Sequence, residues 1–77
     1  MFDKNRFRAQ IVLRGMTYGQ VASMLDINES TLYRKIQRDG DFTRDEINKL
    51  ISGLKIDDPG AIFFANELAE TQDNVTI

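Results

Sequence analysis

The sequence predicts an all-α fold, a compact bundle of about five short helices. Apolar residues recur at the spacing of a helix surface, and no stretch longer than a few residues alternates like a strand. Turn-forming residues interrupt this pattern at Gly15, at residues 39–41 and at residues 57–59. Because 77 residues provide apolar side chains for one core only, we expect one domain at residues 1–69 and a loose, non-periodic tail at residues 70–77.

The first helix is expected over residues 3–14. Its core-facing stripe consists of Phe7, Ile11 and Arg14, with Val12 adjoining. Gly15 follows at the position where a left-handed residue commonly ends a helix.

Residues 17–38 predict two short helices joined by a tight turn. Thr17 and Gln20 have the spacing of a capping box, so the first helix of the pair begins there. Residues 26–28 supply the turn, and Asn28 is a good N-cap for the second helix. The inward-facing residues are Val21, Ala22 and Leu25 in the first helix and Leu32 and Ile36 in the second.

A fourth helix is predicted from Thr43, which repeats the capping-box spacing with Glu46. Phe42, just before this cap, can pack on Ile47 as a hydrophobic staple. Gly53 is expected to end the helix in a Schellman motif, with the following leucine folding back on it. The inward-facing residues are Ile47, Leu50, Ile51 and Leu54.

Residues 57–59, Asp-Asp-Pro, open a fifth helix that is expected to continue through residues 61–70. Three large apolar residues follow one another near its start, and adjacent positions cannot all point inward. At least one phenylalanine should close the bundle over the first helix, which leaves an apolar face as a candidate self-association surface. This surface comprises Ile62, Phe63 and Phe64.

The composition argues against several kinds of site. The chain has no cysteine and no histidine, so it lacks thiolate ligands, imidazole ligands and the usual proton shuttle. Asp57 and Asp58 precede a proline and are typical of helix caps rather than of a catalytic pair. We therefore expect no metal, no cofactor, no small-molecule substrate and no enzymatic activity.

No run approaches the roughly 20 apolar residues of a membrane span, and residues 1–10 lack the apolar segment of a signal peptide. An intracellular protein without a membrane partner is therefore expected. The net charge of −2 hides an uneven distribution. Residues 1–44 carry eight basic and five acidic side chains, whereas residues 45–77 carry two basic and seven acidic ones. This asymmetry predicts that residues 1–44 form a basic face and that residues 45–77 form an acidic face or tail on the opposite side.

Residues 17–38 resemble the helix-turn-helix of the Cro/C1-type (XRE-like) family of phage repressors and related regulators. The resemblance rests on Gln20-Val21-Ala22, Leu25, Ile27 and Ser30-Thr31-Leu32, and it covers about residues 8–64. The later sequence DDPGAIFF is similar to the fifth helix of compact members.

The resemblance implies a lambda-repressor-like bundle that binds double-stranded DNA in the cytoplasm of a bacterial or phage-infected cell. The chain would be a small phage or prophage repressor of Cro/C1 type. In the family geometry the second motif helix, residues 28–38, reads the major groove, and a homodimer on a two-fold operator is a candidate assembly.

Two residues depart from the family pattern. Asp26 stands where the family usually has a glycine with left-handed backbone, a conformation that aspartate tolerates better than most residues. Lys35 stands where an apolar residue usually ends the second motif helix, and Ile36 follows it. A small rotation or extension of that helix is therefore expected.

The resemblance implies base contacts from the exposed face of the second motif helix, namely Asn28, Glu29, Ser30, Tyr33, Arg34 and Gln37. Arg34 can pair with guanine, Gln37 or Asn28 with adenine, and Glu29 with a cytosine amino group. The implied phosphate contacts are Thr17, Tyr18, Thr31, Lys35, Arg38 and Arg44.

Simpler readings stay open for several of these residues. The exposed face can be an ordinary solvated helix surface, and Glu29 can be a first-turn charge that suits the helix dipole. For Arg6, Arg8 and Arg14, a phosphate contact and a plain surface charge are equally supported.

The alternative function is a protein-interaction module on the same scaffold, such as an antitoxin-like or antirepressor partner, which the acidic overall balance favours. The dependence of binding on salt concentration distinguishes these two functions, because DNA binding weakens steeply as the salt concentration rises and apolar pairing between proteins does not.

Overall fold

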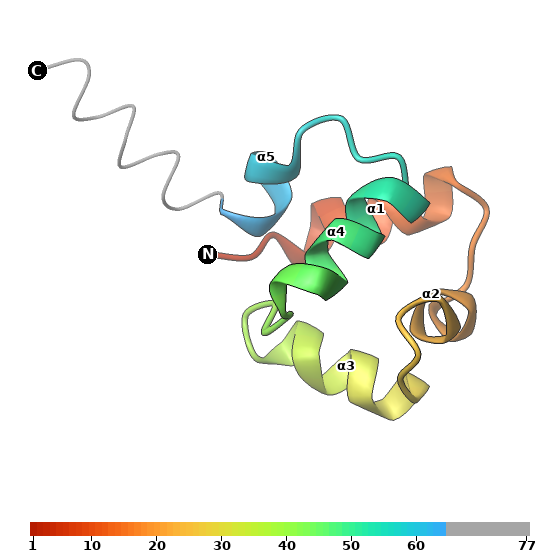
Figure 1. The fold of residues 1–77 in the computed structure, drawn as a ribbon. Helices are drawn as coiled ribbons and strands as arrows, with labels where there is room; N and C mark the ends of the chain where they lie inside the picture. The colour runs from red at the N-terminus through yellow and green to blue at the C-terminus, as the bar shows by residue number, and fades with distance from the viewer. Residues whose placement is uncertain (65–77) are drawn as a thin grey trace, which may run out of the picture.

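The computed structural model describes residues 1–64 of the chain, and this part folds into five α-helices without a strand (Figure 1). The helices are α1 (Lys4–Leu13), α2 (Tyr18–Met24), α3 (Glu29–Gln37), α4 (Arg44–Gly53) and α5 (Pro59–Phe63). The predicted all-α class is confirmed. The prediction for the last helix is corrected at Phe64, which is the non-helical C-cap of α5. Residues 65–70 of that predicted helix lie outside the described residues, as do the expected domain end at residue 69 and the predicted tail at residues 70–77. Within residues 1–64, no helix combines the length and apolar character that a membrane span requires.

Side-chain caps define the helix starts largely as predicted. Both capping boxes form, the first between Thr17 and Gln20 and the second between Thr43 and Glu46, with bonds of 2.9–3.2 Å. Asp58 caps α5 in a related way, and the proline after it occupies the first helical position. These caps satisfy backbone N–H groups that have no partner within their own helix.

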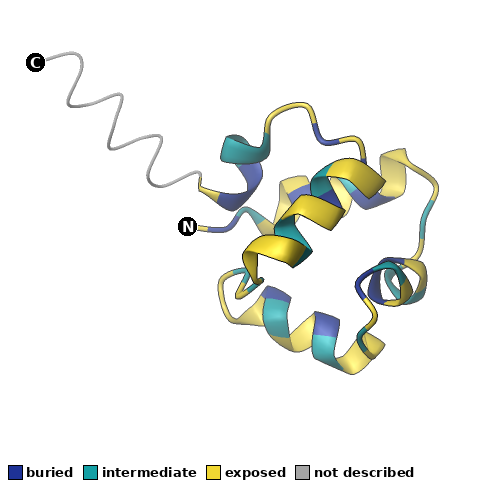
Figure 2. Cartoon of the chain, viewed as in Figure 1, coloured by how far each residue is buried: buried dark blue, intermediate teal, exposed yellow. Residues whose placement is uncertain are grey.

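One continuous apolar core joins all five helices (Figure 2). It contains every inward residue predicted for α2 and α3, and the predicted residues of α4 are buried or partly buried. Val12 corrects the prediction for α1, because its side chain is 68% exposed. Phe7 and Ile11 take the inward side of α1, and Val12 lies one position further round the helix.

Phe2, which no predicted helix included, is a central core residue. Its ring lies 5.2 Å from that of Phe7 and 5.8 Å from those of Phe42 and Phe63, between ring centroids. Its backbone N–H donates to Oδ1 of Asp39 at 3.0 Å. The segment before α1 therefore ties the α3–α4 turn to α5 through apolar packing as well as hydrogen bonds.

The end of α4 also differs from the prediction. The left-handed residue is Lys55, with φ of 51°, and not Gly53, which is the last helical residue. The N–H of Ile56 donates to the carbonyl of Ile51 at 3.0 Å, which is the long bond of a Schellman motif. Leu54, fully buried, keeps right-handed backbone as the C-cap of α4, so the left-handed position falls on Lys55.

Two side chains of α1 hold this end of α4 in place. Gln10 Nε2 donates to the carbonyl of Leu54 at 2.7 Å, and Arg14 Nε donates to the same carbonyl at 2.8 Å. Arg14 Nη2 reaches the carbonyl of Lys55 at 3.0 Å. These bonds satisfy carbonyls that the helix leaves open, so Arg14 serves the fold and is not a plain surface charge.

Gly40 offers a test of this core, with Gly15 as its matched control. Both glycines are left-handed, with φ of 69° and 66°. A Cβ at Gly40 would overlap the Phe2 ring, whereas one at Gly15 meets nothing within 4 Å. We expect Gly15→Ala to lower the free energy of unfolding by about 1–2 kcal/mol from backbone strain alone. Gly40→Ala should lower it by about 1–3 kcal/mol more, because Phe2 must move.

Urea denaturation of the two variants measures this difference. Equal losses would mean that Phe2 does not pack against the α3–α4 turn.

Candidate nucleic-acid interface

The turn between α2 and α3 sets the position of α3. Asp26 adopts the left-handed conformation that the family resemblance implies, with φ of 59°. The N–H of Ile27 donates to the carbonyl of Ala22 at 3.0 Å. Ala22 is buried in the part of α2 that packs against α3, which agrees with a small residue at the helix contact. Asn28 occupies the N-cap position with extended backbone, but its side chain makes no capping bond. The predicted N-cap position of Asn28 is therefore confirmed, but the expected side-chain bond does not form and the exposed amide is open to solvent.

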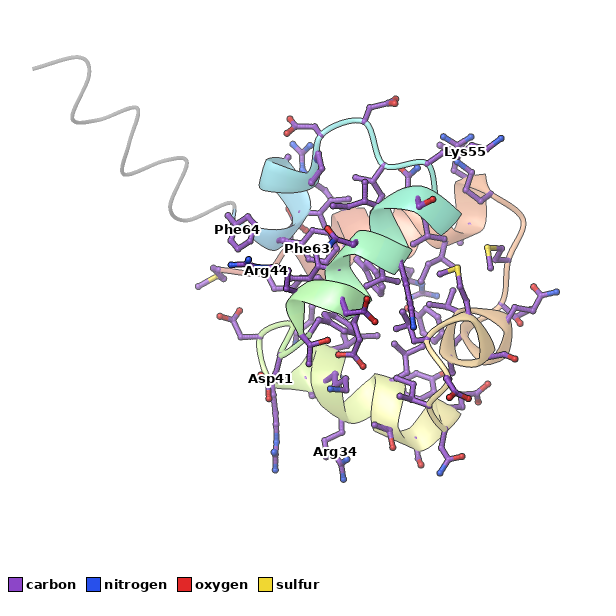
Figure 3. All side chains as sticks on the ribbon, in the orientation of Figure 1. Arg34, Asp41, Arg44, Lys55, Phe63 and Phe64 are labelled. Carbon is purple, nitrogen blue, oxygen red and sulfur yellow. The ribbon has the colours of Figure 1, made fainter. Side chains whose placement is uncertain are left out.

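α3 divides sharply into a buried and an exposed side. Leu32 and Ile36 face the core, and at about 100° per residue Arg34 lies opposite the midpoint between them. Arg34 points away from the body of the bundle (Figure 3). The residues predicted for the outer face are all exposed, namely Asn28, Glu29, Ser30, Tyr33, Arg34 and Gln37.

Several cations near α3 are free of ion pairs. Arg34, Arg38 at the end of α3 and Arg44 at the start of α4 are exposed, and none has a carboxylate within ion-pair distance in residues 1–64. Thr17 is exposed as well, although its hydroxyl already caps α2. Their charges and positions leave Arg34, Arg38 and Arg44 available to an anionic partner.

Lys35 is not available in the same way. Its Nζ lies 3.2 Å from Oε1 of Glu46 and donates to the carbonyl of Asp41 at 3.3 Å. The Lys35 side chain is 21% exposed and that of Glu46 is 12% exposed, so this pair links α3 to the start of α4 at the edge of the core. Ile36 takes the buried place next to it. This position of Lys35 does not support its predicted phosphate contact.

The Lys35–Glu46 pair makes stability depend on pH. Partial burial opposes ionisation of Glu46, but hydrogen bonds from the Thr43 backbone and Lys35 outweigh it and lower the pKa of Glu46. A lowered pKa in the folded state adds stability above the unfolded value of about 4.3, and this stability is lost as the pH falls through the folded value.

Glu46→Gln tests this, because glutamine keeps the capping oxygen and loses only the charge. We expect a loss of about 1 kcal/mol in the free energy of unfolding at pH 7 that shrinks below about pH 4. Asp45→Asn is the matched control, since its pair with Lys49 is exposed and should contribute little. Urea denaturation from about pH 3 to 7, roughly the range over which a carboxyl group titrates, measures the free energy of unfolding of both variants. A pH-independent difference would contradict the linkage.

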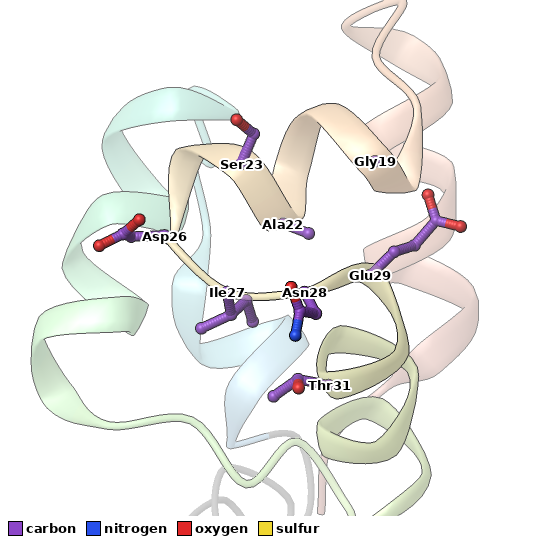
Figure 4. A pocket seen from close by; sticks show the side chains of 8 residues that line it. All are labelled: Gly19, Ala22, Ser23, Asp26, Ile27, Asn28, Glu29 and Thr31. Carbon is purple, nitrogen blue, oxygen red and sulfur yellow. The ribbon is translucent and has the colours of Figure 1, made fainter.

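An open groove of about 510 Å³ lies between α2 and α3 (Figure 4). We call it the acidic groove, because its charged residues are Asp26 and Glu29; its lining is Gly19, Ala22, Ser23, Asp26, Ile27, Asn28, Glu29 and Thr31. Glu29 folds back toward α2, since a Cβ at Gly19 would lie 2.9 Å from its Oε1. This position favours a role for Glu29 as a first-turn charge that interacts with the helix dipole, and not as a contact to cytosine. Thr31 is partly buried in the same groove.

A second groove, of about 450 Å³, borders α3 next to α1. We call it the basic groove, because Lys4 and Arg8 are its charged residues; its lining is Lys4, Asn5, Arg8, Tyr18, Tyr33, Ile36 and Gln37. Tyr33 packs edge-on against Tyr18, with ring centroids 5.0 Å apart at 78°. Lys4 Nζ donates to Oε1 of Gln37 at 3.2 Å, so α1 and α3 are bridged across the groove.

The sequence interpretation missed Lys4 and left Arg8 undecided. Their four-residue spacing on α1 was the available signal, because it places both on one side of the helix. Arg6 belongs elsewhere, since its Nε lies 3.4 Å from Oδ2 of Asp3. These cations differ in their place in the tertiary structure, because Lys4 and Arg8 line the groove beside α3 and Arg6 lines another groove, and no local sequence pattern specifies this.

The predicted self-association surface is smaller than expected. Ile62 and Phe63 are buried, and Phe63 packs against Phe2 and Phe7 over α1. Phe64 is 43% exposed and is the one of the three that faces outward. The surface prediction is therefore corrected to Phe64, because the short α5 turns both preceding side chains into the core.

No protein-family model, curated protein or solved structure matches this chain. Within residues 1–64, no group of three acidic, histidine or cysteine side chains is arranged to hold a metal ion. The functional interpretation therefore depends on the surface of α3 and its two bordering grooves.

Proposed function

We propose that this protein binds double-stranded DNA sequence-specifically, with α3 lying in the major groove. The observation that supports this most directly is the position of Arg34. It stands at the centre of the outward face of α3, opposite Leu32 and Ile36, and has no carboxylate partner within residues 1–64. An unpaired arginine in the middle of a protruding helix suits bidentate contact with guanine.

The arrangement of charge adds support. Arg38 and Arg44 are exposed near the end of α3, whereas Asp57 and Asp58 lie in the α4–α5 connection at the opposite end of the bundle (Figure 1). Carboxylates also stand on the α3 side, at Asp26 and Glu29 in the acidic groove and at Asp39 and Asp41 in the α3–α4 turn, so the cations there form local sites and not a continuous basic face. The overall charge of −2 is compatible with DNA binding in such an arrangement.

The regulatory role rests on the motif resemblance alone. On that basis we propose a repressor of Cro/C1 type, from a phage or prophage, acting in the cytoplasm. The competing interpretation is a protein-interaction module in which the cations of α3 merely complement the negative end of its dipole.

Arg34→Ala should relax specificity as well as lower affinity. A bidentate contact with guanine contributes about 1–3 kcal/mol of discrimination against the wrong base. The measurement is selection of bound sequences from random duplexes at two salt concentrations, followed by titration of the selected site and of mismatched sites. Arg44→Ala should weaken all sequences equally, and Lys49→Ala should change nothing. Equal weakening of every sequence by Arg34→Ala would make it a phosphate contact.

We further propose that two copies bind neighbouring half-sites, about 34–36 Å apart, with Phe64 supporting weak self-association. Phe64→Ser should abolish cooperative binding and any dimer of the free protein, as measured by sedimentation with and without DNA. Val12→Ser is the matched control, since it removes an exposed apolar side chain from α1. Unchanged stoichiometry and cooperativity in Phe64→Ser would remove this residue from the interface.

A further inference from the structure

The two grooves beside α3 differ in charge. The acidic groove carries Asp26 and Glu29 and no cation, and the basic groove carries Lys4 and Arg8 and no carboxylate. A helix in the major groove has a phosphate strand on each side of it. The electrostatic difference therefore selects the α1 side of α3 as the closer approach to a phosphate strand.

The spacing of the cations suits a repeating anion. Lys4 and Arg8 are one turn apart on α1, which separates them by about 6 Å along the helix axis. Phosphates along one DNA strand rise by about 3.4 Å of duplex axis per nucleotide and also step around the duplex, so neighbouring phosphates are further apart than this rise and two cations one helical turn apart can each contact one of them. Tyr18 of α2 and Tyr33 of α3 line the same groove, and their rings pack edge-on against each other.

We propose that the basic groove is a binding site for the sugar–phosphate backbone of one DNA strand. Lys4 and Arg8 contact successive phosphates, and Tyr33 lies along the sugar between them. This site rests on the proposed function and extends it, because it places one strand of the duplex against α1. In this site Tyr33 contacts the DNA backbone and not a base, which differs from the role expected from the sequence.

The Lys4–Gln37 bond gives the site a link to base reading. Both side chains are exposed, and a phosphate is a stronger acceptor for an ammonium group than a neutral amide is. When Lys4 turns to phosphate, the amide of Gln37 becomes free to face a base edge. Lys4→Ala removes this bond as well, so it leaves Gln37 free on either duplex.

The experiment measures the affinity of Lys4→Ala, Arg8→Ala and the double variant for the selected duplex and for a scrambled duplex, over a range of salt concentrations. Each single variant should weaken both duplexes alike and reduce the slope of log affinity against log salt by about 0.9. Arg6→Ala is the matched control on the same helix. It should keep the slope of the parent, because Arg6 lines a different groove and pairs with Asp3.

The outcomes separate this site from the function as a whole. If the parent binds its site and Arg34→Ala relaxes specificity while Lys4→Ala and Arg8→Ala keep the parent slope, the basic groove is not a backbone site and the proposed function stands. If the parent binds no duplex, or binds the single strand as tightly, both proposals fall. Because all three substituted side chains are exposed, circular dichroism should show unchanged folding.

Discussion

Burial of Leu32 and Ile36 is the constraint on which the rest of the surface depends. These two side chains lock the rotation of α3 about its axis, because turning the helix would expose both of them. Once they are buried, Arg34 has to face outward, Tyr33 and Gln37 turn toward α1, and Thr31 turns toward α2. The apolar core thereby determines which polar groups can meet a partner.

The charged residues divide into those that build the fold and those left free. Arg14 closes the end of α4, and Lys35 joins α3 to α4 through Glu46. Lys35 and Glu46 are partly buried and need each other, because desolvation without a hydrogen bond is costly, whereas Arg14 is exposed and satisfies open carbonyls. Arg8 and Arg34 carry the same formal charge but have no ion-pair partner within residues 1–64. Formal charge counts therefore overstate the basic surface. Within residues 1–64 several unpaired cations stand beside α3, whereas Lys55 lies at the end of α4 away from it (Figure 3).

Much of the local structure follows from short-range patterns. The two capping boxes depend on residues three positions apart, so spacing alone predicts them. The left-handed backbone at Asp26 was expected from the family resemblance, and the structure has it. The end of α4 shows the limit of this reasoning. Gly53 is the residue best suited to a left-handed position, but the buried Leu54 keeps right-handed backbone and the left-handed position falls on Lys55. Local preference alone did not place the end of this helix.

The sequence by itself determined the number of helices, most of their boundaries, the core stripes of α2 and α3 and the outward face of α3, because helical periodicity and capping are local properties. Only the tertiary structure decided that Phe2 belongs to the core, that Lys35 and Arg14 are engaged, and that Lys4 lies across from Gln37. Each of these contacts joins residues from different elements. The physical reason is that helix packing depends on the complementary shapes of distant segments, which no spacing within one helix encodes.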